Sequence, residues 1–253
     1  LIKFFTEILG LNELSVRIGS LFCWFIAAFF SFKLSELFTK GSGIYSLLLL
    51  TILPYFFTQS IVITPDSPLI ACWSATLYYL YNSLVLGKPR SWYKAGLWLG
   101  LGMLSKYTIC LLGIATFVYM ITRPEGRRWF LRKEPYIAAV ITVLVFSPVI
   151  YWNAQHEWVS FLFQSQRRFA NVTSFNLPRV FALTLLFLTP VGCWSLLKLG
   201  LTKPTTLSSK RFLQTFTFVP WCFFAIHSLN HEINFNWLGP IFLAALPWVS
   251  TVI

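Results

Sequence analysis

The chain has 253 residues, of which 57% are hydrophobic and only 11% are charged, and its mean hydropathy is +0.68. A soluble globular domain carries about a quarter charged residues, so this composition excludes an ordinary soluble fold and indicates an integral membrane protein. A formal charge of +12 would suggest nucleic-acid binding in a soluble protein. In a membrane protein, basic residues kept on the cytoplasmic side give the same excess, so no nucleic-acid partner is predicted.

Eight apolar runs follow one another along the chain, and the fourth is hinged near Ser105 and Lys106. A membrane crossing takes roughly 20 helical residues, so the two halves of the fourth run, 95–104 and 107–122, are each short for a full crossing. We predict an all-α fold, a polytopic transmembrane helical bundle with about eight or nine membrane segments. The runs cover residues 18–38, 44–63, 68–86, 95–122, 136–152, 180–197, 212–229 and 237–253.

The distribution of charge decides whether the fourth run crosses once or twice. If it crosses twice, 13 of the 20 basic residues fall on one side, as expected for cytoplasmic loops. If it crosses once, the basic clusters at 87–94 and 123–133 face opposite sides and the bias weakens. We therefore predict two crossings, which places the unusual polar residues together on the outer face: Glu7, Glu13, Asp66, Lys106, His156, Glu157, His231 and Glu232.

The segment TPDSPL at 64–69 places Asp66 between two prolines at the start of a predicted helix. Asp or Ser before a proline in the first helical position is a common N-cap, which is a purely structural interpretation. Ser67, directly before Pro68, serves that cap equally well and leaves Asp66 free. A carboxylate at the membrane edge is costly unless it is solvated, paired or metal-bound, so a functional role stays open beside the structural one.

Lys106 lies at the hinge of the fourth run, in GLGMLSKYT at 100–108. A lone lysine among apolar residues could extend its ammonium group to the membrane surface. Alternatively, the ammonium group and the nearby helix N-terminus could bind a phosphate. Because positive charge is scarce on the outer side, we favour the phosphate interpretation.

Two outer connections carry most of the remaining polar residues. The segment from Trp152 to Arg168 combines aromatic rings with amides, a histidine, a glutamate and two arginines. It fits either an amphipathic stretch at the membrane surface or the lining of a sugar pocket. His156-Glu157 lacks the second histidine of a zinc motif. In the later connection, His227 and His231 are four residues apart, and metal binding there is a minor alternative.

Five segments occur in a fixed order along the chain: GLNELSVR at 10–17, TPDSPL at 64–69, GLGMLSKYT at 100–108, WNAQHEWVSF at 152–161 and NWLGP at 236–240. Together they resemble the GT-C class of membrane glycosyltransferases, in particular the bacterial branch related to protein O-mannosyltransferases and to the transferase that adds aminoarabinose to lipid A. The resemblance implies a GT-C-type fold. It divides the chain into 1–16, the end of a first outer amphipathic loop, and 17–253, the transmembrane glycosyltransferase core.

The implied activity is transfer of a sugar from a polyprenyl-phosphate-linked donor by an inverting single displacement. The acceptor would be lipid A or another glycolipid, a glycan or a protein, at the periplasmic face of a bacterial inner membrane. The family's catalytic base is expected upstream of Leu1, so the chain is expected to be a fragment without a complete active site. No cofactor is implied with certainty, and a divalent cation stays open.

The resemblance also assigns roles to residues of this chain. Asp66 matches the family's second acidic position, close to the donor phosphate or a bound cation. The predicted donor-phosphate residues are Lys106, Tyr107 and Arg167. The predicted sugar or acceptor pocket comprises Trp152, Asn153, His156, Glu157, Trp158, His231, Glu232, Asn236 and Trp237.

Two other functions compete with the transferase. A transporter or flippase of a lipid-linked precursor also uses intramembrane charge and broken helices, but it predicts charges near the membrane midplane and related halves. Here the charges cluster at one face and no repeat occurs. The other alternative is a truncated, inactive remnant of the enzyme.

Overall fold

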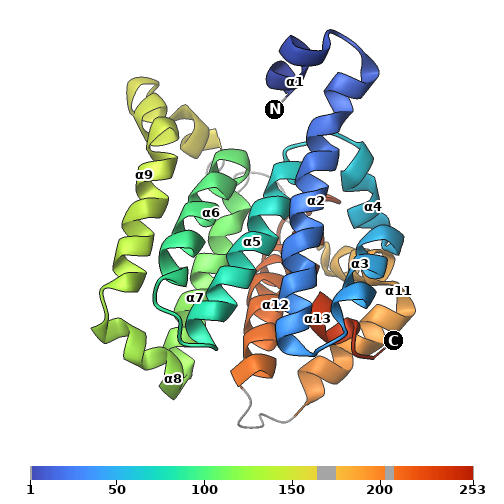
Figure 1. Ribbon diagram of the computed structural model, residues 1–253, viewed down its shortest axis with the longest axis vertical. Coiled ribbons are helices and arrows are strands. Elements are labelled where there is room, and N and C mark those ends of the chain that lie inside the picture. The colour runs from blue at the N-terminus through green and yellow to red at the C-terminus, as the bar shows by residue number, and fades with distance from the viewer. Residues whose placement is uncertain (1, 164–174, 203–207, 253) are drawn as a thin grey trace.

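The computed structural model describes residues 2–163, 175–202 and 208–252, and within these ranges it contains helices and no strands (Figure 1). The all-α prediction is confirmed for this part of the chain. In chain order the elements are α1 (Ile2–Leu9), α2 (Glu13–Phe38), α3 (Gly43–Ile52), α4 (Pro54–Ile61), α5 (Asp66–Leu84), α6 (Ser91–Ser105), η1 (Tyr107–Ile109), α7 (Cys110–Thr122), α8 (Pro124–Arg127), η2 (Arg128–Leu131), α9 (Glu134–Gln155), α11 (Leu177–Leu201), α12 (Ser208–His227), η3 (Gly239–Ala244) and α13 (Leu246–Val249).

In the part of the chain that the structure describes, three helices, α2, α9 and α11, are long and apolar enough to cross a membrane by length and composition. Two bent pairs raise the number to five if each is one span: α3 with α4, bent by 74°, and residues 107–122 with 124–131, bent by 109°. The predicted eight or nine membrane segments are not reached by this measure, partly because α6 and α7 have only 15 and 13 residues. The number of crossings stays a prediction.

The fourth apolar run forms two helices, as predicted from its hinge. Helix α6 ends at Ser105, Lys106 is extended with φ −157° and ψ 129°, and η1 leads into α7. Glycines make this turn compact. A Cβ at Gly102 would lie 2.3 Å from the Ile109 side chain, which is closer than real carbon atoms approach. The absence of a side chain at Gly102 therefore lets the chain fold back directly after Lys106.

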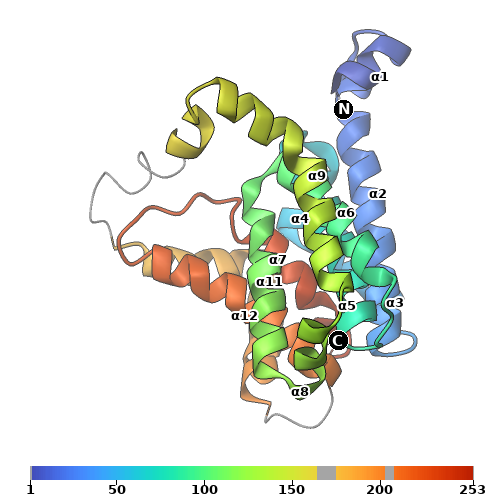
Figure 2. The same ribbon diagram turned by 90° about the vertical axis from the view of Figure 1, so that its left-hand side faces the viewer.

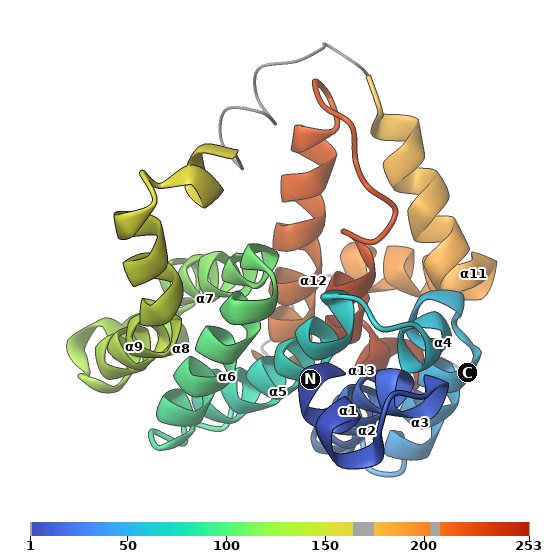
Figure 3. The same ribbon diagram turned by 90° about the horizontal axis from the view of Figure 1, so that it is seen from above.

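Helix α5 forms the centre of the bundle and is buried along most of its length between α2 and α6. Helix α6 packs on α5 with one side and on α9 with the other. At the contact with α9, a Cβ at Gly96 would lie 2.3 Å from the Ala138 carbonyl oxygen. Close approach through glycine is the usual way in which helices pack in a membrane. Seen from above, α12 lies between α7 and α11 (Figure 3).

The two ends of the bundle differ in the residues that they carry. Helix α1 and the C-terminal end of α9 lie at one end, and α8 lies at the other (Figure 1, Figure 2). The start of α5, with Asp66, and the end of α6, beside Lys106, lie at the α1 end. The basic residues of α8 and η2 are therefore separated from Asp66 and Lys106 by the length of the helices. Which end faces outward stays a prediction.

Two apolar runs differ from the helices expected of them. The run 44–63 is divided between α3 and α4, because Leu53 is extended before Pro54, as residues that precede proline usually are. The last run, 237–253, was expected to cross the membrane, but it forms the 3-10 helix η3 and the one-turn helix α13, both buried in the core. Pro240 and Pro247 start these short helices and cannot donate backbone hydrogen bonds. The structure thus corrects the prediction of a spanning helix there.

Helix α2 begins at Glu13, where Asn12 and Ser15 form a reciprocal capping box. The predicted division into an outer loop, 1–16, and a core, 17–253, stays a prediction.

Candidate active site

Asp66 is the first residue of α5 and is buried, with 1% of its side chain exposed. Its side chain makes no N-cap hydrogen bond, and its backbone N–H instead donates to Thr64 Oγ1 at 3.2 Å. Ser67 does not cap the helix either, because its hydroxyl donates to the Val62 carbonyl oxygen at 3.1 Å. The N-cap interpretation is therefore wrong for both residues, and the Asp66 carboxylate is available for other contacts.

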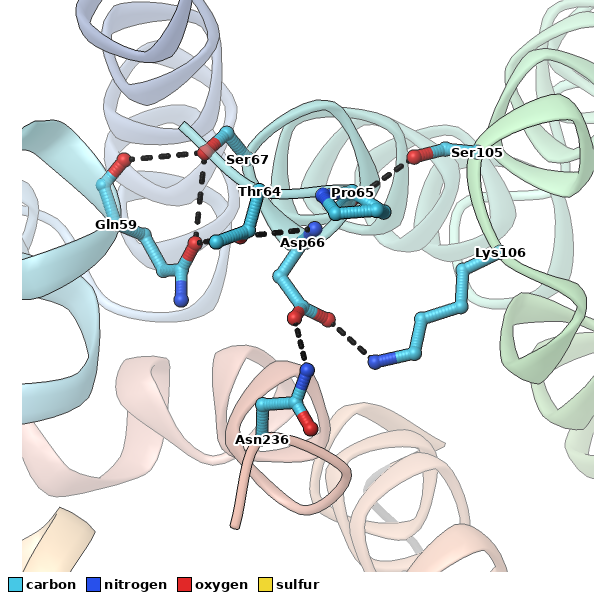
Figure 4. A network of polar contacts seen from close by, with 8 residues as sticks. All are labelled: Gln59, Thr64, Pro65, Asp66, Ser67, Ser105, Lys106 and Asn236. Atoms are coloured by element: carbon cyan, nitrogen blue, oxygen red, sulfur yellow. Dashed lines mark hydrogen bonds and ion pairs between the residues drawn. The ribbon is translucent and has the colours of Figure 1, made fainter. Parts of the chain in front are cut away.

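The Asp66 carboxylate binds nitrogen donors from two distant segments (Figure 4). Lys106 Nζ donates to Asp66 Oδ1 at 2.7 Å, and Asn236 Nδ2 donates to Asp66 Oδ2. The donors come from the hinge after α6 and from the loop before η3. Lys106 is 20% exposed, so one member of the ion pair is buried and the other reaches the surface of a cavity. The structure thus brings together three residues that the sequence assigned to one site.

A polar network holds Asp66 in this position. Thr64 Oγ1, which accepts the Asp66 N–H, donates to Gln59 Oε1 at 3.0 Å (Figure 4). Gln59 belongs to α4 and is 5% exposed, so α4 and the start of α5 are joined by buried polar contacts. On the Lys106 side, Ser105 Oγ donates to the Pro65 carbonyl oxygen at 2.5 Å. These bonds fix the start of α5 against both α4 and the hinge.

The loop that carries Asn236 is positioned by a glycine. A Cβ at Gly239 would lie 2.2 Å from the ring of Tyr55, which is buried in α4. Only a residue without a side chain allows so close an approach, and it brings η3 directly onto α4. Asn236 lies three residues before Gly239, so this packing sets the distance between Asn236 and Asp66.

A cavity of about 660 Å³ lies beside the ion pair, with Lys106 in its wall. Its walls are largely apolar and come from the end of α6, η1, α7, α9, the segment after α9, α12 and the loop before η3. Among the described residues that line it, Lys106 is the one lysine or arginine. The lining residues whose side chains carry a nitrogen or oxygen atom are Ser105, Lys106, Tyr107, Thr108, Ser160, His227 and Trp237.

Two predicted residues, Tyr107 and Trp237, lie in the wall of this cavity beside Lys106. The Tyr107 ring stacks on Phe161, with centroids 5.6 Å apart and an interplanar angle of 26°. Trp237 lies 5.7 Å from the ring of His227, which in turn lies 4.8 Å from the ring of His231. His231 is thus close to the lining residues without being one of them.

Four residues at the end of α9 and just after it were predicted to line the sugar pocket but do not line this cavity: Trp152, His156, Glu157 and Trp158. Trp152 and Trp158 are 46% and 47% exposed, and His156 and Glu157 are also exposed. The Trp152 and His156 rings stack on each other, with centroids 4.1 Å apart, and neither is among the residues that line the cavity.

Asn153 is fully buried but is used locally, since it donates to the Val149 carbonyl oxygen and accepts the Ser160 N–H. Glu232 is exposed. Neither Asn153 nor Glu232 is among the residues that line the cavity, and their predicted roles in a sugar or acceptor pocket stay predictions. Arg167 lies outside the described residues.

The described part of the chain has no group of three histidine, cysteine, aspartate or glutamate side chains placed to hold a metal ion. Both Asp66 oxygens already accept from nitrogen donors, one of them an ammonium group. This donor set fits a cation supplied by Lys106 better than a metal ion. A divalent cation stays a prediction.

Among the residues of the site that the sequence did not assign to it are Gln59, Ser105 and His227. Gln59 did have a signal, because a lone amide inside an apolar run must find hydrogen-bond partners when buried. His227 was noted only for its spacing from His231. Ser105 was noted only as part of the hinge beside Lys106, and nothing in the sequence predicted its bond to Pro65, 40 residues away.

The helical fold, with its apolar spans and its charged site at one end of the bundle, defines an integral membrane protein. Residues 1–152 match the family described as "Dolichyl-phosphate-mannose-protein mannosyltransferase". The chain belongs to this family of membrane glycosyltransferases. No curated protein matches the sequence.

Two solved structures share the fold. The chain is similar to ArnT from Cupriavidus metallidurans in the apo state, with a TM-score of 0.80 and 15% sequence identity over 99% of this chain and 47% of that one. It is similar to the same protein bound to undecaprenyl phosphate, with a TM-score of 0.79 and 15% identity over 99% of this chain and 48% of that one. The chain therefore spans about half the length of the solved proteins that it matches.

Proposed function

We propose that the protein containing this chain transfers a sugar from a polyprenyl-phosphate-linked donor to an acceptor at the outer face of the membrane. The observation that carries the proposal is the Asp66–Lys106 ion pair, which places one ammonium group in the wall of a largely apolar cavity. A lipid phosphate requires this combination, a cation for its headgroup and apolar surface for its chain. The similar fold of ArnT, solved with undecaprenyl phosphate bound, supports the same donor class.

The proposed reaction is a single displacement that inverts the anomeric carbon. The acceptor oxygen attacks that carbon, and the bond from the carbon to the phosphate oxygen breaks. The carrier phosphate leaves with the electron pair, and Lys106 stabilises its charge. The acceptor proton passes to a carboxylate base, a role that we do not assign to Asp66.

Asp66 acts in this scheme as a positioning residue for Lys106. Its carboxylate is 1% exposed, does not line the cavity, and accepts from both Lys106 and Asn236. A carboxylate held in this way is poorly placed to take a proton from an acceptor, whereas it fixes the ammonium group at the cavity wall. Asp66 thus fits the role of the second acid and not that of the base.

We further place the site at the periplasmic face of a bacterial inner membrane, with a glycolipid such as lipid A, a glycan or a protein as acceptor. The support is the charge distribution, because the basic residues of α8 and η2 lie at the end of the bundle opposite Lys106. Lysine and arginine gather on the cytoplasmic side of membrane proteins. The same distribution disfavours a transporter, which would place its charges near the midplane.

Transfer by the full-length protein tests the proposal. With a polyprenyl-phosphate sugar as donor, Lys106→Ala is expected to lower kcat/KM by about 100-fold, the effect of removing one group that stabilises developing negative charge. Asp66→Asn should lower it by less, because the ammonium group remains. Lys3→Ala, at an 88% exposed lysine of α1, is the matched control and should keep full activity.

Full transfer activity after both Asp66→Asn and Lys106→Ala would refute the proposal. So would movement of a lipid-linked precursor across the membrane without any sugar transfer, which would support the transporter. No transfer by the wild-type full-length protein with any polyprenyl-phosphate sugar would support the inactive remnant.

A further inference from the structure

A second cavity, of about 440 Å³, lies between α5, α6, α7 and α9. Its lining residues from α5, α6 and α9 lie mostly in the halves of these helices that are far from Lys106, whereas those from α7 run from Gly113 to Met120, and Phe130 of η2 also lines it. Apart from the hydroxyls of Thr76, Thr116, Thr142 and Tyr136 and the indole N–H of Trp92, the lining side chains are apolar. The volume lies in the range of about 300–1,000 Å³ that is typical of ligand pockets.

The cavity exists because α7 stands away from the tightly packed α6–α9 pair, and Gly113 keeps the space open. Gly96 and Gly113 line opposite walls, but they differ in what a side chain would meet. A Cβ at Gly96 would clash with the Ala138 carbonyl oxygen, whereas a Cβ at Gly113 would have no atom within 4 Å.

Gly113 lies inside α7, where glycine is an unfavourable residue. Neither close packing nor a left-handed backbone explains its presence, because its φ is not positive. The consequence of glycine at this position is empty space in the wall of the cavity.

The cavity opens sideways, toward the surface that faces lipid. Phe117 and Tyr136 line it and are also 56% and 55% exposed, so they form its mouth. Around the mouth, Ile121 and Val140 are exposed apolar side chains on α7 and α9. In a bilayer such a surface contacts acyl chains, and an empty apolar cavity beside it forgoes the dispersion contacts that a chain would supply.

The end of this cavity is also strongly basic. Residues 124–131 bend by 109° away from α7, so η2 runs across the ends of the helices and not along them. Lys133 lies two residues before the lining residue Pro135, is exposed, and has no carboxylate within 4.0 Å in the described part of the chain. Two acidic residues accompany the basic cluster, and one of them, Glu134, is already paired with Arg132 at 3.3 Å. The other basic residues here are Arg123, Arg127 and Arg128.

We propose that this second cavity binds one acyl chain of an anionic phospholipid from the leaflet at the α8 end, with the lipid phosphate at Lys133. Acyl chains gain little by leaving one apolar environment for another, so the headgroup must supply the selectivity. Anionic headgroups are drawn to basic residues at the membrane surface. The site lies at the opposite end of the bundle from Lys106 and does not depend on the proposed transferase activity.

Native mass spectrometry of the full-length protein, after exchange into detergent with phosphatidylglycerol or with phosphatidylcholine, tests this site. Wild-type protein should retain one phosphatidylglycerol molecule at least 10-fold more than phosphatidylcholine. Gly113→Phe, which fills the cavity, should abolish the retention. Ile114→Phe adds a similar side chain at the adjacent, 46% exposed position and should leave retention unchanged.

A surface variant keeps the test independent of folding. Lys133→Gln should lower phosphatidylglycerol retention several-fold, whereas Lys40→Gln, at an exposed lysine in the loop between α2 and α3, should not. Equal retention by wild type and Gly113→Phe would overturn the proposal, and so would equal retention of the two phospholipids. Displacement of the lipid by polyprenyl phosphate would also overturn it, because the cavity would then serve the donor chain.

Discussion

Loss of the ammonium group at Lys106 should destabilise the protein more than neutralisation of Asp66. Lys106→Met leaves the Asp66 carboxylate, 1% exposed, with Asn236 as its remaining side-chain donor. Breaking a buried ion pair from one side costs about 3–5 kcal/mol. Asp66→Asn leaves Lys106, which is 20% exposed and reaches the cavity, so it costs about 1–2 kcal/mol for a lost hydrogen bond.

Thermal unfolding in detergent, followed by tryptophan fluorescence, separates these values. At about 2–4 °C per kcal/mol, Lys106→Met should lower Tm by about 6–20 °C, and Asp66→Asn by about 2–8 °C. The double variant removes both charges and should resemble Asp66→Asn, so the coupling equals the cost of Lys106→Met alone, about 3–5 kcal/mol. Equal effects of the two single variants, or a double variant equal to their sum, would refute the description of a buried carboxylate held by a partly exposed ammonium group.

Glycine substitutions give two further predictions, both measured as Tm. Gly239→Ala places its Cβ 2.2 Å from the Tyr55 ring and should destabilise the protein by about 1–3 kcal/mol. Adding Tyr55→Leu should restore the stability. A Gly239→Ala variant as stable as wild type would contradict the close packing of η3 on α4. Gly96→Ala, facing the Ala138 carbonyl oxygen at 2.3 Å, should destabilise by a similar amount, whereas Gly113→Ala should be neutral or stabilise by about 0.5–1 kcal/mol. Equal effects at positions 96 and 113 would show that the two walls of the second cavity do not differ as described.

Much of the site was predictable from local sequence and charge. A carboxylate and a lysine in apolar surroundings both need partners, and the hinge at Lys106 with the alternation of basic loops placed them at one end of the bundle. That reasoning predicted Asp66 and Lys106 in one site before any contact was known. The sequence thus predicted that both residues lie at the same end of the bundle, but it did not predict the ion pair between them.

What the sequence left open or predicted wrongly has a physical origin. Asn236 was predicted as a pocket residue, but its bond to Asp66 was not, because 170 residues separate the two and no local pattern carries information over that distance. The run 237–253 is apolar because it is buried in protein, and hydropathy cannot distinguish such a segment from one that faces lipid. Trp152 and His156 were expected in a pocket because of their residue types, yet they stack on each other at the surface. Residue type predicts which groups are able to bind a ligand, but packing decides where they point.

The central claim is that Lys106, held by Asp66, binds the phosphate of a polyprenyl carrier, and equilibrium binding of polyprenyl phosphate to the full-length protein tests it most directly. Lys106→Gln should weaken binding by at least 10-fold and make it less dependent on salt, whereas Lys3→Gln should bind as wild type does. Unchanged affinity of Lys106→Gln, with the variant folded as judged by its Tm, would contradict the claim.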